Sequence, residues 1–167
     1  MRWTVIDDAV PAATCGALVD FYRRNIETYG WKNKVGFWSF RLINSHDLPD
    51  GSDSKVTLNA IGRLVVDSIA REWGEDASIQ ASQVVSWPEG TRQDAHLDRF
   101  FPNTRFAAIL YLNDDYAGGQ TFLEIPQRIE RVDPATGRLL IFEGAGILHG
   151  VEEIVNGERY TNALWLG

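Results

Sequence analysis

The stretch GRLLIFEGAGILHGVEEIVNGERYTNALWL, residues 137–166, decides the fold class of this chain. Apolar runs of strand length alternate in it with glycine and asparagine, which favour turns between strands. Similar runs, IQASQVVSW, RFAAILYLN and QTFLEI, lie upstream at residues 79–87, 105–113 and 120–125. The second half of the chain is therefore predicted to be an antiparallel β body, of which a jelly roll is one closed arrangement.

The first half of the chain predicts helices and two strands. Apolar residues recur at helical spacing over 13–26, and again from Leu58 to Ile69 in a helix that ends at Gly74. Residues 3–6 and 35–43 are strand-like, and 44–54 form a polar loop. We therefore predict an α+β fold in one domain, 1–167. Its helix-rich part, 1–75, packs on one sheet of a jelly-roll part, 76–167.

The bulk composition is that of a globular protein. The chain has 167 residues, of which 44% are apolar, and a formal net charge of -7. That charge argues against a nucleic-acid partner, because phosphate binding depends on Lys and Arg. Cys15 is the only cysteine, and no run resembles a signal peptide or a membrane span. We predict a cytoplasmic protein without a membrane partner, and the sequence leaves the oligomeric state open.

The stretch QDAHLDRFF, residues 93–101, raises the possibility of a metal site. On a strand, His96 and Asp98 would point to the same side and could reach one ion. His149, in the apolar run GILHGV, is a better third ligand than His46, which lies in the polar loop. Two histidines and a carboxylate are the ligand set of non-haem Fe(II) oxygenases. A polar surface turn and a hydrogen-bonded core histidine remain the alternatives.

Arg159 opens a run, RYTNALWLG, in which both strand faces are largely apolar. A buried arginine without a partner is very costly. The partner could be a carboxylate of the protein. It could equally be a carboxylate of a bound diacid, which a guanidinium grips with two hydrogen bonds.

Residues 84–166 resemble the 2-oxoglutarate- and Fe(II)-dependent dioxygenases, and they resemble the prolyl 4-hydroxylase-like branch most. The resemblance is carried by the order and spacing of HLD, YLND, GGQTFLE, GRLLIFEG and LHGVEEIVNGERYTNALW. The resemblance implies a double-stranded β-helix with N-terminal helices on one sheet. It also implies Fe(II), 2-oxoglutarate and O₂ as cofactor and cosubstrates, with ascorbate as a candidate for sustaining turnover. The implied metal ligands are His96, Asp98 and His149. The implied cosubstrate residues are Arg159, which would bind the C5 carboxylate, Tyr111, Thr121 and the pocket-wall residue Trp165.

The resemblance has departures. Relatives often carry tyrosines where this chain has Trp87 and Gln93, which puts cosubstrate or substrate contacts of the first tyrosine in doubt. Arg105 resembles an arginine near the substrate entrance, although its offset is one residue short. Gly118 and Gly119 are predicted to serve a turn that needs positive φ.

The implied activity is hydroxylation of a C–H bond, with succinate and CO₂ as co-products. The prolyl hydroxylase resemblance favours a prolyl residue in a peptide or protein as substrate. A small molecule or free amino acid is an alternative, as are a cupin-like metal protein that does not use 2-oxoglutarate and a silent binding domain. Nucleic-acid demethylases of the superfamily typically carry a second arginine six positions after the first, where this chain has Trp165.

Overall fold

The computed structural model describes residues 1–35, 38–99 and 101–167. Its helices are α1 (Ala12–Tyr29), η1 (Ser45–Asp47), a single 3-10 turn, and α2 (Asp53–Trp73). The strands of the first half are β1 (Trp3–Ile6), β2 (Gly30–Val35) and β3 (Trp38–Asn44). Those of the second half are β4 (Ile79–Pro88), β5 (Gln93–His96), β6 (Phe106–Tyr111), β7 (Ala117–Gly118), β8 (Thr121–Ile125), β9 (Arg128–Val132), β10 (Leu139–Phe142), β11 (Leu148–Val151), β12 (Ile154–Asn156) and β13 (Glu158–Leu166).

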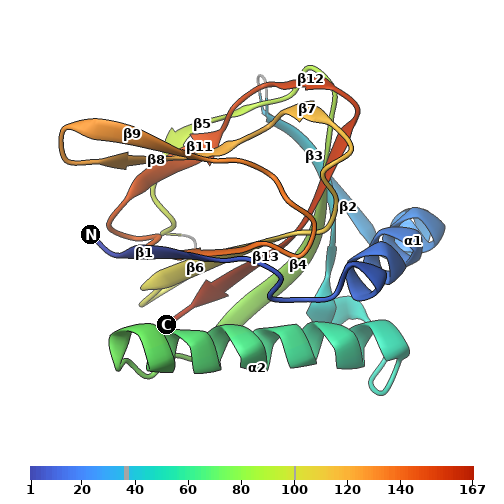
Figure 1. Cartoon of the computed structure of the whole chain (residues 1–167). Coiled ribbons are helices and arrows are strands. Elements are labelled where there is room, and N and C mark those ends of the chain that lie inside the picture. Colours follow the sequence, from blue (N-terminus) through green and yellow to red (C-terminus); the bar gives the residue numbers. More distant parts are fainter. Residues whose placement is uncertain (36–37, 100) are drawn as a thin grey trace.

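The strands form two facing sheets and a small ribbon (Figure 1). The large sheet has seven strands in the order β1-β10-β6-β13-β4-β3-β2, and every described pairing in it is antiparallel. The smaller sheet has the order β5-β11-β8-β9, and β12 pairs with β7. Two antiparallel sheets lying face to face, with helices on one outer face, confirm the predicted α+β jelly roll.

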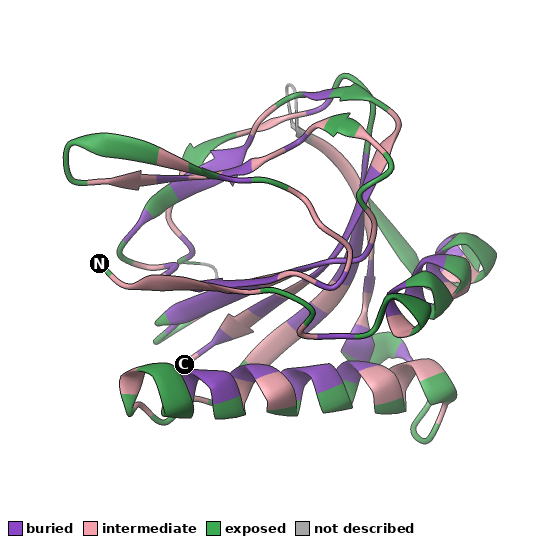
Figure 2. Cartoon of the chain, in the orientation of Figure 1, coloured by how far each residue is buried: buried purple, intermediate pink, exposed green. Residues whose placement is uncertain are grey.

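The two α-helices cover the outer face of the large sheet, as Figure 1 shows. Their buried stripes include Leu18 and Ile26 on α1 and Ile61 and Val65 on α2, and they share one core with Leu110 of β6. Figure 2 shows each helix buried toward the sheet and exposed on the other side. Burial of such a stripe against a sheet holds these helices in place more than intrinsic propensity does. No described helix is long and apolar enough to cross a membrane.

A second core fills the space between the sheets at the β1 end. Tyr111, Leu140 and Phe142 of the large sheet pack there with Leu123 of the smaller sheet and Ile147, which precedes β11. A third, smaller cluster joins Trp87 and Val85 to Val151 and Ile154. Side chains of both clusters line a cavity, among them Phe142 of the second core and Trp87 and Val151 of the third cluster.

The predicted strand 35–43 was partly wrong. It corresponds to β3, which begins at Trp38, and the preceding strand β2 was not predicted; the two pair from Gly30↔Ile43 to Val35↔Trp38. Residues 36 and 37 of the predicted strand lie outside the described residues. The pairing brings β2 and β3 to one edge of the large sheet, so the helix-rich half of the chain supplies part of the jelly roll as well.

The second predicted helix and its end are confirmed. α2 runs to Trp73, and Gly74 adopts the left-handed conformation with φ of 66° while its N–H donates to the carbonyl of Ala70. Glycine suits this position because it has no Cβ to clash in that conformation. Gly118 and Gly119 also have positive φ, 74° and 67°, as predicted.

Candidate metal centre and cosubstrate pocket

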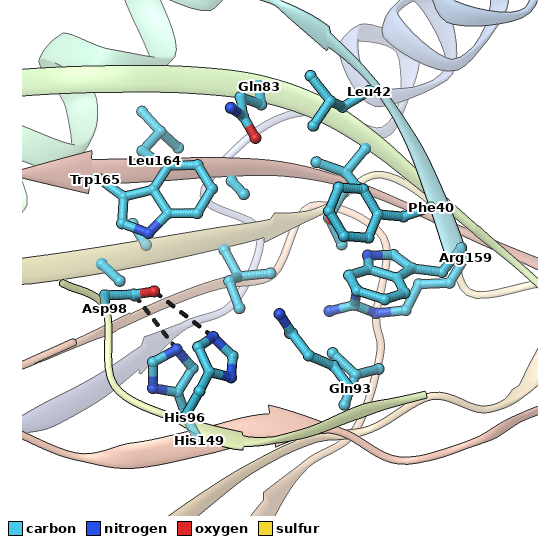
Figure 3. Close-up of a pocket in the computed structure, with 18 of the residues that line it drawn as sticks. Phe40, Leu42, Gln83, Gln93, His96, Asp98, His149, Arg159, Leu164 and Trp165 are labelled. Carbon is cyan, nitrogen blue, oxygen red and sulfur yellow. Dashed lines mark ion pairs between the residues drawn. The ribbon is translucent and has the colours of Figure 1, made fainter. Parts of the chain in front are cut away.

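A cavity of about 490 Å³ opens between the two sheets. Its lining is mostly apolar, with a few polar side chains at separate places, which is the usual character of a small-molecule site. His96, Asp98 and His149 lie at one end and Arg159 at the other (Figure 3). Gln93 lies between them, and Val151 also lines the cavity.

The three predicted metal ligands meet at one point. One ligand atom each from His96, Asp98 and His149 lies within 4.8 Å of the other two. The carboxylate of Asp98 is 3.7 Å from His96 Nε2 through Oδ1 and 3.3 Å from His149 Nε2 through Oδ2. Strand pairing causes this convergence, because His96 of β5 and His149 of β11 are directly opposite each other in register.

The other nitrogen of each imidazole fixes the orientation of its ring. His149 Nδ1 lies 2.8 Å from the carbonyl oxygen of Ile147, and His96 Nδ1 lies 3.0 Å from that of Asp94. A carbonyl oxygen can only accept, so each Nδ1 carries a proton, and Nε2 is the nitrogen of each ring that faces Asp98 and can ligate a metal. Metal-binding histidines in proteins are commonly held in this way. The donor set therefore fits a divalent metal ion with two neutral imidazoles and one carboxylate.

The surroundings of His96 favour its neutral form. Burial lowers the pKa of the His96 imidazole below its ordinary value of 6.5, and the nearby His149 ring lowers that pKa further. A neutral ring is the state that can donate a lone pair to a metal.

Asp98 reaches the site by a route that the sequence pattern did not predict. β5 ends at His96, so Asp98 lies in the loop that follows and is not on the strand with His96. Its N–H donates to the carbonyl of Gly144 at 3.0 Å, which anchors the loop against the turn before β11. A Cβ on Gly144 would lie 2.8 Å from Asp98 Oδ2, so glycine leaves room for the carboxylate. Asp98 is 2% exposed.

Arg159 is buried without a carboxylate partner among the described residues. The residue is 1% exposed, its Nη2 donates to Thr121 Oγ1 at 3.2 Å, and its Nε has no hydrogen-bond partner. The guanidinium lies 5.5 Å from the centre of the Tyr111 ring. A cation left in this state costs free energy unless an anion completes the site. The arrangement therefore suits a carboxylate entering from the cavity.

Tyr111 and Thr121 support Arg159 rather than line the cavity. The Tyr111 hydroxyl is 2.7 Å from Thr121 Oγ1 and 3.2 Å from the carbonyl oxygen of Val132. The two side chains are fully buried beside Arg159. The structure thus brings both predicted cosubstrate residues to Arg159, through hydrogen bonds that hold Thr121 in position.

Tyr116 is a neighbour of Arg159 that the sequence gave no reason to select. Its hydroxyl is buried close to the Arg159 guanidinium. Burial raises the pKa of the Tyr116 hydroxyl, and the positive charge of Arg159 opposes part of that rise. A Cβ on Gly119 would lie 2.9 Å from the Tyr116 ring and 3.3 Å from Arg159 Cδ, so glycine at this turn lets both side chains fit.

The other predicted residues divide between the cavity and the surface. Trp165, Trp87 and Gln93 all line the cavity, and the Trp87 ring packs on Phe40 with centroids 4.8 Å apart. Arg105 instead pairs with Glu75 outside the cavity.

His46 is at the surface, with a side chain 75% exposed, and it is not part of the triad. A further pair of cavity residues, Gln83 and Asn44, was missed by the sequence analysis. Nothing in the local sequence distinguishes them, since their interest comes from the strand pairing that brings them together.

The fold has known counterparts. A prolyl-4-hydroxylase from Pseudomonas putida superposes with a TM-score of 0.79 at 22% identity, covering 98% of this chain and 91% of that one. A prolyl hydroxylase from Trichoplax adhaerens, solved in complex with a hypoxia inducible factor oxygen degradation domain peptide fragment, has the same TM-score at 16% identity, covering 98% and 82%. At these identities the likeness shows the fold alone.

Sequence relatives are matched over shorter segments. Prolyl 3-hydroxylase 3 from Homo sapiens is 41% identical over 64 residues, which are 36% of this chain and 9% of the human protein. The model of the 2OG-Fe(II) oxygenase superfamily matches residues 81–167, the segment that carries the triad and Arg159. The sequence match, the jelly roll and the His-Asp-His cluster all agree, and this chain belongs to the 2OG-Fe(II) oxygenase superfamily.

Proposed function

We propose that this chain is an Fe(II)- and 2-oxoglutarate-dependent dioxygenase that hydroxylates a prolyl residue in a peptide or protein. The observation that carries the cosubstrate assignment is Arg159, a buried guanidinium that faces the same cavity as the triad and lacks a carboxylate partner among the described residues. A cupin-like metal protein would explain the triad, but it gives no reason for this cation.

The proposed ligands are His96, Asp98 and His149, and the proposed partner of the cosubstrate's C5 carboxylate is Arg159. The carbonyls of Asp94 and Ile147 keep the imidazoles oriented, so the ligand set is held in advance of binding. These residues would hold a metal ion that, when bound, would supply activation of O₂ and of 2-oxoglutarate, with succinate and CO₂ as co-products.

The remaining residues position the reactants. Thr121 accepts hydrogen bonds from the Arg159 guanidinium and from the Tyr111 hydroxyl, so the cation that would bind the far end of the dicarboxylate is held in position. Trp165 and Phe101, whose ring centroids are 6.4 Å apart, and Leu164 line the cavity. Apolar walls exclude water, which protects the reaction from side reactions and strengthens the electrostatic interactions inside.

The choice of a prolyl substrate rests on the relatives. The two structural counterparts are prolyl hydroxylases by name, one of them in complex with a peptide, and the human relative is a prolyl 3-hydroxylase. A peptide would have to enter this cavity, whose lining includes the aromatic side chains of Trp31 and Phe40.

Coupled product analysis tests the proposal. Proline-rich peptides and free L-proline are supplied in parallel with Fe(II), 2-oxoglutarate, ascorbate and O₂, and succinate and oxidised product are followed by mass spectrometry. We expect succinate and a gain of one oxygen on the peptide. Oxidation of free proline alone would move the activity to small-molecule hydroxylation. Absence of succinate under every condition would refute the cosubstrate assignment.

A further inference from the structure

A chain of hydrogen bonds runs from the surface into the cavity along β3 and β4. Asp47 Oδ2 accepts from the indole N–H of Trp31 at 3.1 Å and from the side-chain amide nitrogen of Asn44 at 3.3 Å. Asn44 Oδ1 accepts in turn from Gln83 Nε2 at 2.9 Å. Asn44 and Gln83 are directly paired in register, and both line the cavity.

The Asp47 carboxylate determines which group donates and which accepts in each hydrogen bond of this series. A carboxylate can only accept hydrogen bonds, so Asn44 must turn its NH₂ group toward Asp47 and its oxygen toward Gln83. Gln83 must then donate through its own NH₂ group. A flipped Asn44 would place its oxygen against the Asp47 carboxylate, which is unfavourable. The carbonyl oxygen Oε1 of Gln83 is therefore not used in this series of hydrogen bonds and faces away from Asn44.

The free acceptor of Gln83 belongs to the cavity. Figure 3 shows the Gln83 amide on the cavity wall beside Trp165 and Leu42, on the far side of the space from Gln93. Among the described residues, no hydrogen bond to Gln83 Oε1 is made. An acceptor held in a largely apolar wall selects for an N–H donor on the molecule that fills the space, because leaving it unpaired has a cost.

We propose that Gln83 is a specificity-determining residue, whose Oε1 accepts a hydrogen bond from a backbone N–H next to the target proline of a peptide substrate. Asn44 and Asp47 are positioning residues that fix the direction of this acceptor. The inference rests on the proposed prolyl hydroxylase function and adds the group by which the peptide is recognised. A prolyl nitrogen inside a peptide has no N–H, so the donor belongs to a neighbouring residue.

The charges around the cavity favour a peptide over a free amino acid. Among the described residues that line it, Asp98 is the only carboxylate, and that group belongs to the proposed metal site. The ammonium group of a free amino acid would be desolvated there without a carboxylate to pair with. A neutral amide N–H needs one neutral acceptor, and Gln83 provides it.

The test combines a variant with a modified substrate. A peptide that the enzyme oxidises is compared with analogues in which each backbone nitrogen beside the target proline is methylated in turn. We expect methylation at one position to lower kcat/KM of the unmodified enzyme about ten-fold, the usual effect of losing one hydrogen bond. The same methylation should have almost no further effect on Gln83→Met, which has lost the acceptor already.

Two further variants separate positioning from general damage. Asp47→Ala removes the carboxylate that sets the direction of the chain, and it should weaken the effect of N-methylation as Gln83→Met does. Asp20→Ala, at an exposed position on α1, is the matched control and should retain the full effect. The affinity for 2-oxoglutarate should be unchanged in all three variants, which shows that the fold and the cosubstrate site are intact.

The outcomes distinguish the inference from the function beneath it. If peptides are oxidised but N-methylation has equal effects on the unmodified enzyme and on Gln83→Met, the prolyl hydroxylase function stands and the role of Gln83 is refuted. If no peptide is oxidised while 2-oxoglutarate is still consumed, both the peptide substrate and the inference are overturned.

Discussion

His149 and His46 have the same side chain in opposite surroundings. His149 is 5% exposed and its ring is oriented by the carbonyl of Ile147, whereas His46 is at the surface beside Asp47. We expect His149→Ala to abolish turnover and the binding of one equivalent of Fe(II) or Mn(II), because two ligands rarely hold such an ion. Isothermal titration calorimetry measures the stoichiometry. His46→Ala is the control and should bind metal normally. One equivalent bound by His149→Ala with unchanged affinity would show the ligand set to be wrong.

Arg159 allows the cosubstrate site to be tested apart from the metal. Arg159→Ala removes the buried cation that would pair with the C5 carboxylate of 2-oxoglutarate. Loss of this pair should weaken 2-oxoglutarate binding by roughly thirty-fold to several thousand-fold. Metal binding should survive, since Arg159 is not among the three proposed ligands. Calorimetry with 2-oxoglutarate provides the measurement, and Arg105→Ala, which removes an exposed arginine, is the control. Normal affinity in Arg159→Ala would leave a cupin-like protein as the better explanation.

For single residues, the sequence predicted which side chains gather around the cavity better than it predicted the backbone that positions them. His96 and Asp98 were selected by their spacing in a chain with three histidines, and His149 and Arg159 because such residues stand out in apolar runs; the structure brings the first three together and places Arg159 in the same cavity. The position of Asp98 beyond the end of β5 was not predictable, since it depends on a hydrogen bond to Gly144, which is remote in sequence. Gln83 was missed for the same reason, because its partner Asn44 lies 39 positions away.

The turn at β7 should be less tolerant of change than the end of α2. Gly118 and Gly74 both have positive φ, but a Cβ on Gly118 would collide with the carbonyl oxygen of Glu153, whereas a Cβ on Gly74 would meet open space. Gly74→Ala should cost about 1 kcal/mol, from the backbone conformation alone. Gly118→Ala should cost clearly more, because the paired backbone must move. Urea unfolding gives both free energies, and equal losses would contradict this explanation.

Helices whose apolar residues recur at regular spacing were predicted from the sequence. Strands that form mainly because a neighbouring strand pairs with them were not. The stripes of α1 and α2 follow from residue spacing, and their ends agree with the structure within a few residues. The strand predicted at 35–43 corresponds to β3, whereas β2, which pairs with it, was not predicted. β9 was missed altogether: its sequence, RIERV, is charged and largely exposed, and it is a strand through its pairing with β8.

Glu75 links three distant parts of the molecule through ion pairs with Arg2 and Arg105. Hydrogen bonds from Arg2 and then Arg105 hold the pKa of the Glu75 carboxyl below its ordinary value of 4.5. The unfolded chain therefore binds the proton more readily, and the stabilisation is fully present above pH 4.5 and is lost as the pH falls through the lowered pKa. Glu75→Gln should reduce the acid sensitivity of the thermal midpoint.

The control for this prediction is Glu89→Gln, which alters another exposed carboxyl outside the network. Thermal unfolding is followed from neutral pH into acid for the unmodified protein and both variants. Because the groups are exposed, the difference should be small and should shrink in high salt. A pH profile of Glu75→Gln identical to that of the unmodified protein would mean that the network contributes nothing measurable.

The position of β5, the strand that carries His96, affects how the protein behaves without metal. β5 lies at the edge of its sheet, with β11 as its ladder partner among the described residues. Edge strands can open without the rest of the domain, and their amides then exchange with solvent early. An ion held by His96, Asp98 and His149 would tie this edge to its neighbour, so we expect deuterium uptake in 93–98 to slow on metal loading while the interior strand β13 hardly changes. Iron shortage would then leave the protein folded, with only the β5 edge of the smaller sheet locally unfolded, and a protease would cut first at that edge.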